Sequence, residues 1–316
     1  MKILTKSQCK KFMDLAVKRT AEYVRENNLK GISLGISGGI DSTIVSIVGL
    51  KAIDELRKKG YKTGYDYVFL NCDSDPFDYK RAKALAKEFK FKLRYLDLTD
   101  WYKASPLLKE ISSDHTRARV AMGNIKCRLR MISLYHSTQL NGYIYLDTDD
   151  LPEEYMGFWT KHGDEGDVKI VQHLTKTELY DLGEYLGVPR IILEAKPGDG
   201  LKVSLGNIAE DQLGLPYIYI EYIMSEMLRV GFDCNGIWSQ LEDKKYISKI
   251  KEISDSIEKP TDSIGKVLEQ SLRTSYKRKY GDPVKHLLPK RKEFGFLEYG
   301  TSEFASRQLK TIKELR

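Results

Sequence analysis

Cysteine is scarce in this chain, which has four in 316 residues and no CxxC pair. That spacing argues against a disulfide scaffold and a structural zinc site, and it favours a reducing, cytoplasmic environment. The five histidines form no set with the spacing of metal ligands. Apolar runs are also short, because none approaches the roughly 18 residues of a membrane span. We therefore expect a globular protein without a membrane partner.

Acidic residues are fewer than basic ones. Lysine and arginine number 52 against 45 acidic residues, which gives a formal net charge of +7. Residues 273–316 hold 12 basic and 5 acidic residues, so this stretch carries the whole excess. A basic excess can bind phosphate groups or nucleic acid, or it can simply form a solvated face.

Apolar periodicity alternates between strand and helix patterns along the first 190 residues. The expected strands are residues 32–36, 65–71, 92–98 and 143–147. The expected helices are residues 42–53, 79–89, 123–140 and 175–187. This alternation predicts a doubly wound α/β fold, with a parallel sheet flanked by helices on both faces.

Three local features refine this prediction. The helix over 175–187 begins with a capping box of Thr175 and Glu178. The helix over 123–140 has one apolar face, formed by Met122, Ile125, Leu129 and Ile132. Two stretches rich in Gly, Asp and Pro, residues 150–172 and 195–212, lack a clear period and are typical of lids or binding loops.

A glycine-rich loop joins the first expected strand to its helix. Backbone N–H groups at a helix N-terminus attract anions, and glycines let the backbone approach closely. Here the loop has neither the GxxxxGK[ST] nor the GxGxxG pattern. Its acid, Asp41, would repel phosphate unless a cation lay between them, so it indicates Mg²⁺ bridging to a triphosphate. A turn that merely caps the helix is the structural alternative. The candidate ATP-binding residues in this stretch are Gly35, Ile36, Ser37, Gly38, Gly39, Ile40, Asp41 and Ser42.

The SGGxDS loop resembles the pyrophosphate loop of the ATP pyrophosphatases, which release pyrophosphate from ATP while adenylating an oxygen. Five further segments, in order along the chain, resemble motifs of the ammonia-dependent NAD synthetase family. They are "GNIKCRLRM" (123–131), "GFWTKHGDEGD" (157–167), "HLTKTELYDLGEYLGVP" (173–189), "EDQLGLPYIYIEYIM" (210–224) and "RTSYKRK" (273–279).

The resemblance implies a Rossmann-like fold of the adenine nucleotide alpha hydrolase type, and a homodimer. It also implies ATP-dependent amidation of nicotinic acid adenine dinucleotide (deamido-NAD) by ammonia through an acyl-adenylate. Asp41 and Glu153 match metal-binding positions, Lys176 a catalytic and ATP-binding lysine, and Thr148 an ATP-contacting threonine. The positions that match deamido-NAD-binding residues are Arg128, Lys161, Asp167, Tyr276 and Lys277.

The sequence departs from the family pattern at three positions and runs past its usual end. Asp147 replaces a glycine and adds negative charge where ATP is expected, unless a second metal or a lysine compensates. Gly198 replaces an ATP-contacting threonine, and Tyr276 replaces a histidine. We expect a synthetase-like domain over residues 1–280 and a basic extension over 281–316, docked as a short helix and strand.

Two alternative functions remain open at this point. The altered loops could serve a different carboxylate or a tRNA base, although the lack of paired cysteines argues against a nucleic-acid substrate. The chain could also be a catalytically inactive homologue that only binds nucleotides. Both alternatives keep the fold and the phosphate-binding loop.

Overall fold

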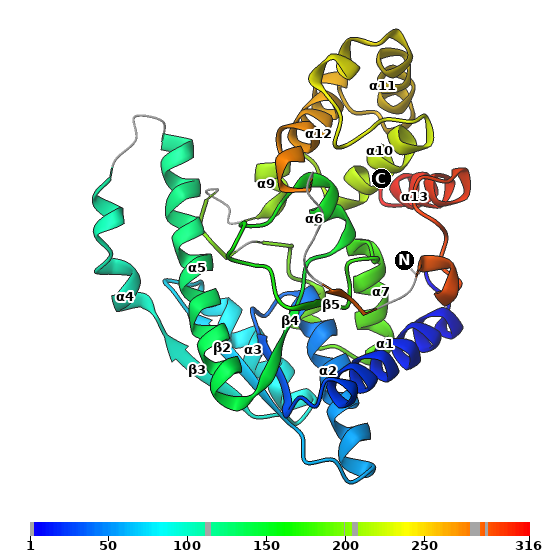
Figure 1. Cartoon of the computed structure of the whole chain (residues 1–316). Helices are drawn as coiled ribbons and strands as arrows, with labels where there is room; N and C mark the ends of the chain where they lie inside the picture. Colours follow the sequence, from blue (N-terminus) through cyan, green and yellow to red (C-terminus); the bar gives the residue numbers. More distant parts are fainter. Residues whose placement is uncertain (1–2, 111–114, 199, 204–207, 279–284, 288–289) are drawn as a thin grey trace.

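The computed structural model describes residues 3–110, 115–198, 200–203, 208–278, 285–287 and 290–316. Its centre is a six-stranded sheet in the order β3-β2-β1-β4-β5-β6, and every neighbouring pair is parallel (Figure 1). The doubly wound α/β class predicted from the sequence is confirmed. The strands are β1 Gly31–Gly35, β2 Gly64–Asn71, β3 Leu93–Asp97, β4 Tyr143–Asp147, β5 Val168–Lys169 and β6 Lys285–His286.

Helices cover both faces of this sheet, because its strands are apolar on both sides. In β2, Tyr67 and Phe69 pack into the core that contains α1, α2 and α7, while Val68 and Leu70 pack toward α5. The helices are α1 Lys6–Glu26, α2 Ile40–Lys58, α3 Pro76–Glu88, α4 Thr99–Lys103, α5 His115–Asn141, α6 Leu151–Met156, α7 Lys176–Leu186, α8 Arg190–Leu193, α9 Ala209–Leu213, α10 Tyr217–Arg229, α11 Lys244–Ile257, α12 Thr261–Arg273 and α13 Ser302–Glu314.

The predicted strands and helices agree with the observed ones to within a few residues, except at the start of α5. That helix begins at His115, eight residues before the predicted 123. The stretch 150–172 lacks a clear apolar period in the sequence, but in the structure it contains two short regular elements, α6 and β5. No helix in the described part of the chain is both long and apolar enough to cross a bilayer.

The apolar face predicted on α5 is only half covered. Met122 and Ile132 are 40% and 48% exposed, while Ile125 and Leu129 pack at the edge of the core beside β2. The buried face of α5 instead carries mostly small or polar residues together with one leucine. They are Gly123, Lys126, Cys127, Leu134 and Thr138. A Cβ at position 123 would meet Leu201 and Val203 within 3.1 Å, so close approach to that segment determines which face is buried.

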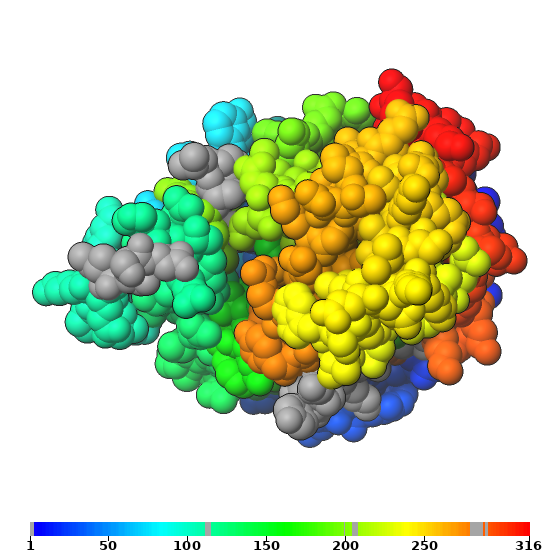
Figure 2. Space-filling view, turned by 90° about the horizontal axis from the view of Figure 1, so that it is seen from above, coloured from blue at the N-terminus to red at the C-terminus, as the bar shows by residue number. Residues whose placement is uncertain are grey.

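A second apolar core lies among α10, α11, α12 and α13, and Met156 of α6 packs into it. Figure 2 shows α10–α12 gathered on one side of the molecule and α4–α5 projecting on the other. The described C-terminal residues pack onto the body, since β6 pairs with β5 and Phe294 and Phe304 are fully buried. The division of the chain at residue 280 stays a prediction.

Candidate active site

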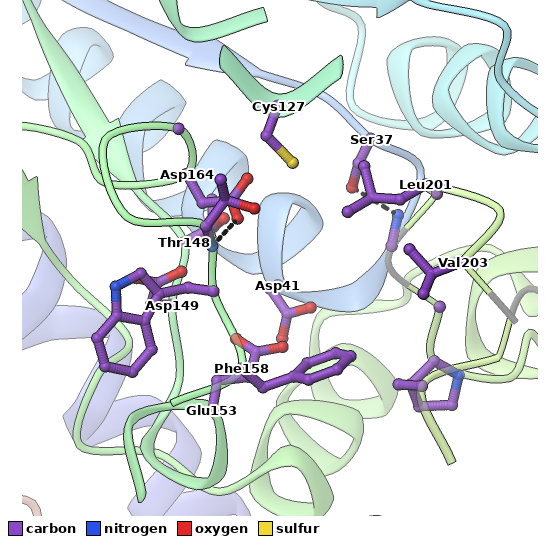
Figure 3. Close-up of a pocket in the computed structure, with 18 of the residues that line it drawn as sticks. Ser37, Asp41, Cys127, Thr148, Asp149, Glu153, Phe158, Asp164, Leu201 and Val203 are labelled. Atoms are coloured by element: carbon purple, nitrogen blue, oxygen red, sulfur yellow. Dashed lines mark hydrogen bonds between the residues drawn. The ribbon is translucent and has the colours of Figure 1, made fainter. Parts of the chain in front are cut away.

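A cavity of about 1100 Å³ lies at the carboxyl ends of β1 and β4. In the strand order, β1 is where the chain turns from building one side of the sheet to building the other. Parallel α/β sheets bind ligands at this switch point, because two loops diverge there. The cavity is lined by the glycine loop after β1, by the loop after β4 and by the segment around Leu201 (Figure 3).

The glycine loop folds as a turn that opens α2, with Gly39 as its N-cap. Gly38 has φ +85°, and a Cβ there would lie 2.4 Å from the carbonyl oxygen of Asp78, so only glycine fits. The hydroxyls of Ser37 and Ser42 lie 3.0 Å apart, and the Gly39 N–H donates to Ser37 Oγ at 3.2 Å. The result is a row of hydroxyl and N–H donors at the positive end of α2.

Lys176, the first residue of α7, places its ammonium group among three carboxylates. Its Nζ lies 2.8 Å from Asp41 Oδ1, 2.9 Å from Glu153 Oε1 and 3.0 Å from Asp150 Oδ2. The predicted capping box of Thr175 and Glu178 starts the helix at this point and so determines where Lys176 lies. The predicted catalytic and metal-binding residues are therefore in direct contact.

Burial and charge act in opposite directions on Lys176. Removal from water would lower the pKa of this ammonium, but the carboxylates of Asp150, Asp41 and Glu153 outweigh that effect and raise the pKa well above its usual value. Burial also raises the pKa of Glu153 and, more strongly, that of Asp150. Lys176 is thus held charged while the site keeps an excess of acids.

The carboxylates of Asp41 and Glu153 fit a role in holding Mg²⁺. Both line the cavity and point toward one another (Figure 3), and they are close enough to share one cation. Over the described ranges, no three His, Cys, Asp or Glu side chains converge as a complete metal site. Mg²⁺ commonly takes one or two carboxylates and fills its other positions with water and substrate phosphates.

Four of the five positions matched to deamido-NAD binding line the cavity: Arg128, Lys161, Tyr276 and Lys277. Arg128 donates to the carbonyl oxygen of Lys161 at 3.2 Å, and both side chains are exposed. Lys277 donates to the carbonyl oxygens of Gly157 and Trp159. Burial lowers the pKa of Lys277, and its ammonium lies 5.1 Å from the centre of the Trp159 ring.

Asp167 and Gly38 are not among the described residues that line the cavity. The carboxylate of Asp167 accepts hydrogen bonds from the Tyr145 N–H at 3.0 Å and from the Tyr135 hydroxyl at 3.1 Å. Asp167 therefore braces the middle of β4, and the geometry gives no support to its predicted contact with the dinucleotide. Gly38 instead contributes the backbone conformation of the loop, since its φ of +85° permits the turn into α2. The other predicted ATP-binding residues, Thr148 included, line the cavity.

Asp147 does not face the nucleotide site as the sequence suggested. It is fully buried, and its carboxylate accepts from the N–H groups of Asp149 and Gly166, both at 2.8 Å. Asp149 does line the cavity, and the buried Lys169 lies 3.6 Å from its carboxylate. Asp147 thus braces the loop, while Lys169 partly balances the charge of Asp149 at the cavity.

Several charged residues of the cavity wall were not predicted from the sequence, among them Asp164 and Arg81. Asp164 accepts from the Thr160 N–H at 2.7 Å and faces the cavity (Figure 3). Arg81 donates to the carbonyl oxygen of Gly38 at 3.1 Å and brings a cation beside the glycine loop. Asp164 lies within the segment 157–167, so its motif could have indicated it, whereas Arg81 lies in a helix without any such signal.

The NAD synthase family model matches residues 13–280. This chain belongs to the NAD synthase family. It is 34% identical over 199 residues to the NH(3)-dependent NAD(+) synthetase of Syntrophomonas wolfei, covering 62% of this chain and 76% of that protein. It is 33% identical over 224 residues to the enzyme of the same name from Mesoplasma florum, covering 70% and 86%.

Solved structures agree on the fold. NMN synthetase from Francisella tularensis superposes with a TM-score of 0.61 at 24% identity, over 82% of this chain and 95% of that one. NAD+ synthetase from Burkholderia pseudomallei superposes with a TM-score of 0.50 at 25% identity, over 60% and 84%. The adenine nucleotide alpha hydrolase-like arrangement expected from the sequence is confirmed.

Proposed function

We propose that this protein is an ammonia-dependent NAD synthetase, a ligase that converts deamido-NAD to NAD with ATP and ammonia. One observation carries the proposal beyond family membership. The donor-rich loop at Ser37–Ser42 and the cluster of Lys176, Asp41 and Glu153 lie on the wall of the same cavity. An enzyme that releases pyrophosphate needs both features at one place, since it must bind a triphosphate and neutralise the charge that develops on it.

The reaction has two steps. A carboxylate oxygen of deamido-NAD attacks the α-phosphorus of ATP, and the bond to the bridging oxygen breaks as pyrophosphate leaves. Ammonia then attacks the acyl carbon, AMP leaves, and a proton passes to water. In the first step Ser37, Gly39 and Ser42 hold the departing pyrophosphate through their hydroxyl and N–H donors, and Lys176 offsets the charge of the phosphoryl group.

Mg²⁺ held by Asp41 and Glu153 would supply charge neutralisation on the phosphate oxygens. These two residues are already oriented for this, because Lys176 Nζ bridges them at 2.8 and 2.9 Å. We propose further that Arg128, Lys161, Tyr276 and Lys277 contact deamido-NAD from the outer part of the cavity. Three of these four side chains are cationic, which suits an anionic dinucleotide.

A homodimer is the second part of the proposal. The apolar face of α5 exposes Met122 and Ile132, and Leu140 near the end of the same helix is 75% exposed. Apolar side chains in a row on one helix are typical of a subunit interface. Ile132→Lys should shift sedimentation from dimer to monomer. The exposed Lys310→Ala, on α13, is the control.

We also propose a cytoplasmic location. All four cysteines lie within the described residues and are buried thiols, as expected in a reducing compartment. Fractionation of cells with antibody detection tests this directly.

The test of the activity is one incubation with ATP, Mg²⁺, ammonium chloride and deamido-NAD, read for AMP and NAD together. Equal amounts of both products are expected. AMP without NAD would mean that the chain adenylates and releases a different product, and absence of both from folded protein would favour a nucleotide-binding homologue. A parallel incubation with the acid mononucleotide, which carries the same carboxylate, shows whether the second nucleotide is required.

A further inference from the structure

Two buried carboxylates hold the backbone on either side of Lys176. Glu178 Oε2 accepts from the N–H of Thr175 at 3.0 Å, and Glu221 Oε1 accepts from the N–H of Thr177 at 3.1 Å. The second oxygen of Glu221 also accepts from the Thr177 hydroxyl at 2.6 Å. The residues directly before and after Lys176 are therefore each fixed by an acid that is fully buried.

Both acids are bound by side chains from the C-terminal part of the chain. Arg291 donates to the two oxygens of Glu178 at 2.8 and 2.6 Å, and Arg307 donates to the same carboxylate at 3.0 Å. Gln308 donates to Glu221. Arg291 is 4% exposed and Gln308 is fully buried. We call Arg291, Arg307 and Gln308 the C-terminal clamp.

The clamp lies outside the part of the chain that defines the family. The family match ends at residue 280, and the clamp begins at Arg291. None of its residues is among the described residues that line the cavity. Its connection to the site therefore runs through Glu178 and Glu221 to the first turn of α7.

We propose that the C-terminal clamp positions Lys176 for adenylation. The inference rests on the proposed function for the role of Lys176, and it makes the clamp residues positioning residues. A lysine side chain is flexible, so the site of its ammonium depends on where its backbone is held. With α7 anchored on both sides of residue 176, Nζ stays between Asp41 and Glu153. A displacement of about 1 Å at such a group can lower the rate about 100-fold.

The first test compares two mild variants of the full-length chain, Arg291→Lys and Gln308→Leu. We expect kcat to fall by about 10-fold to 100-fold in each, with KM for ATP changed by less than about twofold, since the interaction is needed in the transition state. The matched control is Arg190→Met, which removes an exposed arginine paired with Glu184 near the other end of α7. It should keep full activity. Unchanged kcat in both clamp variants would overturn the proposal.

A double-mutant cycle separates positioning from general stability. In a Lys176→Met background the lysine is already gone, so Gln308→Leu should lower the residual kcat no further. If the two losses simply multiply, the clamp acts on something other than Lys176 and the proposal is wrong.

A third measurement does not depend on turnover. Lys176 is 2% exposed, and acetic anhydride should modify it slowly in the wild-type protein, as followed by mass spectrometry of its peptide. Both clamp variants, checked for a cooperative melt, should be modified several-fold faster at Lys176 and not at the exposed Lys310. Equal rates would refute the clamp. Because this readout needs no substrate, it stays decisive if the protein makes no NAD.

Discussion

The first turn of α7 carries two ionic clusters only two residues apart, and they are built in opposite ways. Around Lys176 one cation meets three carboxylates, those of Asp41, Asp150 and Glu153. Around Glu178 one carboxylate meets two guanidinium groups, from Arg291 and Arg307. The first cluster has an excess of acidic residues and the second an excess of basic residues.

Exposure separates them further. The side chains of Asp41 and Glu153 are 22% and 17% exposed and border the cavity, whereas those of Glu178 and Arg291 are 0% and 5% exposed. An excess of acids next to a cavity is costly unless a further cation arrives with the ligand. This contrast supports the proposal that the cluster of Lys176 meets a metal-bound substrate, whereas the burial of the Glu178 cluster fits a role in holding the fold together.

Asp41→Asn tests the cluster around Lys176, which borders the cavity, and has the largest expected effect. The side chains have the same shape, so the melting temperature should stay close to that of the wild type. Pyrophosphate release should fall by about 10³-fold, because a charge that holds the metal and orients Lys176 is lost. The control is Asp54→Asn, an exposed acid of the same helix whose loss should not change the rate. Turnover that survives Asp41→Asn would contradict the metal assignment.

Arg291→Met tests the buried cluster around Glu178. Glu178 would keep only one of its two guanidinium partners, Arg307, and remain buried, so the free energy of unfolding should fall by about 3–5 kcal/mol in urea titrations. Arg190→Met removes two surface ion pairs, those with Glu184 of α7 and with Glu194, and should cost less than about 1 kcal/mol. If the two variants were equally stable, the Glu178 cluster would not be structural, and the contrast between the two clusters would fail.

The sequence predicted the parts of the site that depend on local patterns. The loop Ser37–Ser42, the strand before it and the capping box at Thr175 are each specified within a few residues, because turn, cap and periodicity are local. The roles of Lys176 and Glu153 were inferred only through resemblance, and their contact with Asp41 through the Lys176 ammonium was not predicted. The clamp was missed altogether, since its residues lie 87 to 129 positions from their partners in the sequence, and no local pattern indicates which residues pair over such a separation.

Two predictions differ from the geometry in the same way. Asp167 was expected at the dinucleotide, whereas in this structure its carboxylate accepts from the Tyr145 N–H, and the apolar face predicted on α5 is half exposed. In both, the sequence identifies the residue type but does not give the direction of the side chain. The direction of a side chain depends on how closely the neighbouring segments approach its element. On α5, for example, Gly123 allows the segment at Leu201 to lie close to the helix. The spacing of residues along one element does not contain that information.

The two carboxylates held by the clamp should respond to pH in different ranges. Burial would raise the pKa of Glu178, but Arg291 and Arg307 lower it to about 2, so its contribution to stability is lost only as pH falls from about 4.5 toward 2. Burial raises the pKa of Glu221 to about 7. The folded state then binds more protons than the unfolded state between pH 4.5 and 7, and stability falls as pH rises through that range.

Glu221→Gln should remove the second effect. Urea titrations at pH 5, 6, 7 and 8 should show a wild-type loss of up to about 3 kcal/mol with rising pH. The variant should lose clearly less, because an amide does not ionise. Glu269→Gln, an exposed change on α12, serves as the control and should keep the wild-type slope. A slope unchanged by Glu221→Gln would show that another group titrates in this range.

The smallest expected effects come from Asp164 and Asp167, two acids of one loop. They repeat the contrast between a residue at the cavity and a residue that holds the fold. Asp164 faces the cavity, so Asp164→Asn should lower kcat/KM about tenfold, because hydrogen bonds of a charged group contribute about 1.5–3 kcal/mol.

Asp167 is held by Tyr135 and the Tyr145 N–H, so Asp167→Asn should instead cost about 1–2 kcal/mol of stability with KM for deamido-NAD nearly unchanged. A raised KM for deamido-NAD in a stable Asp167→Asn protein would support the contact between Asp167 and the dinucleotide that the motif predicted. It would also mean that the loop moves when the substrate binds, because the carboxylate would have to leave β4 to reach the cavity.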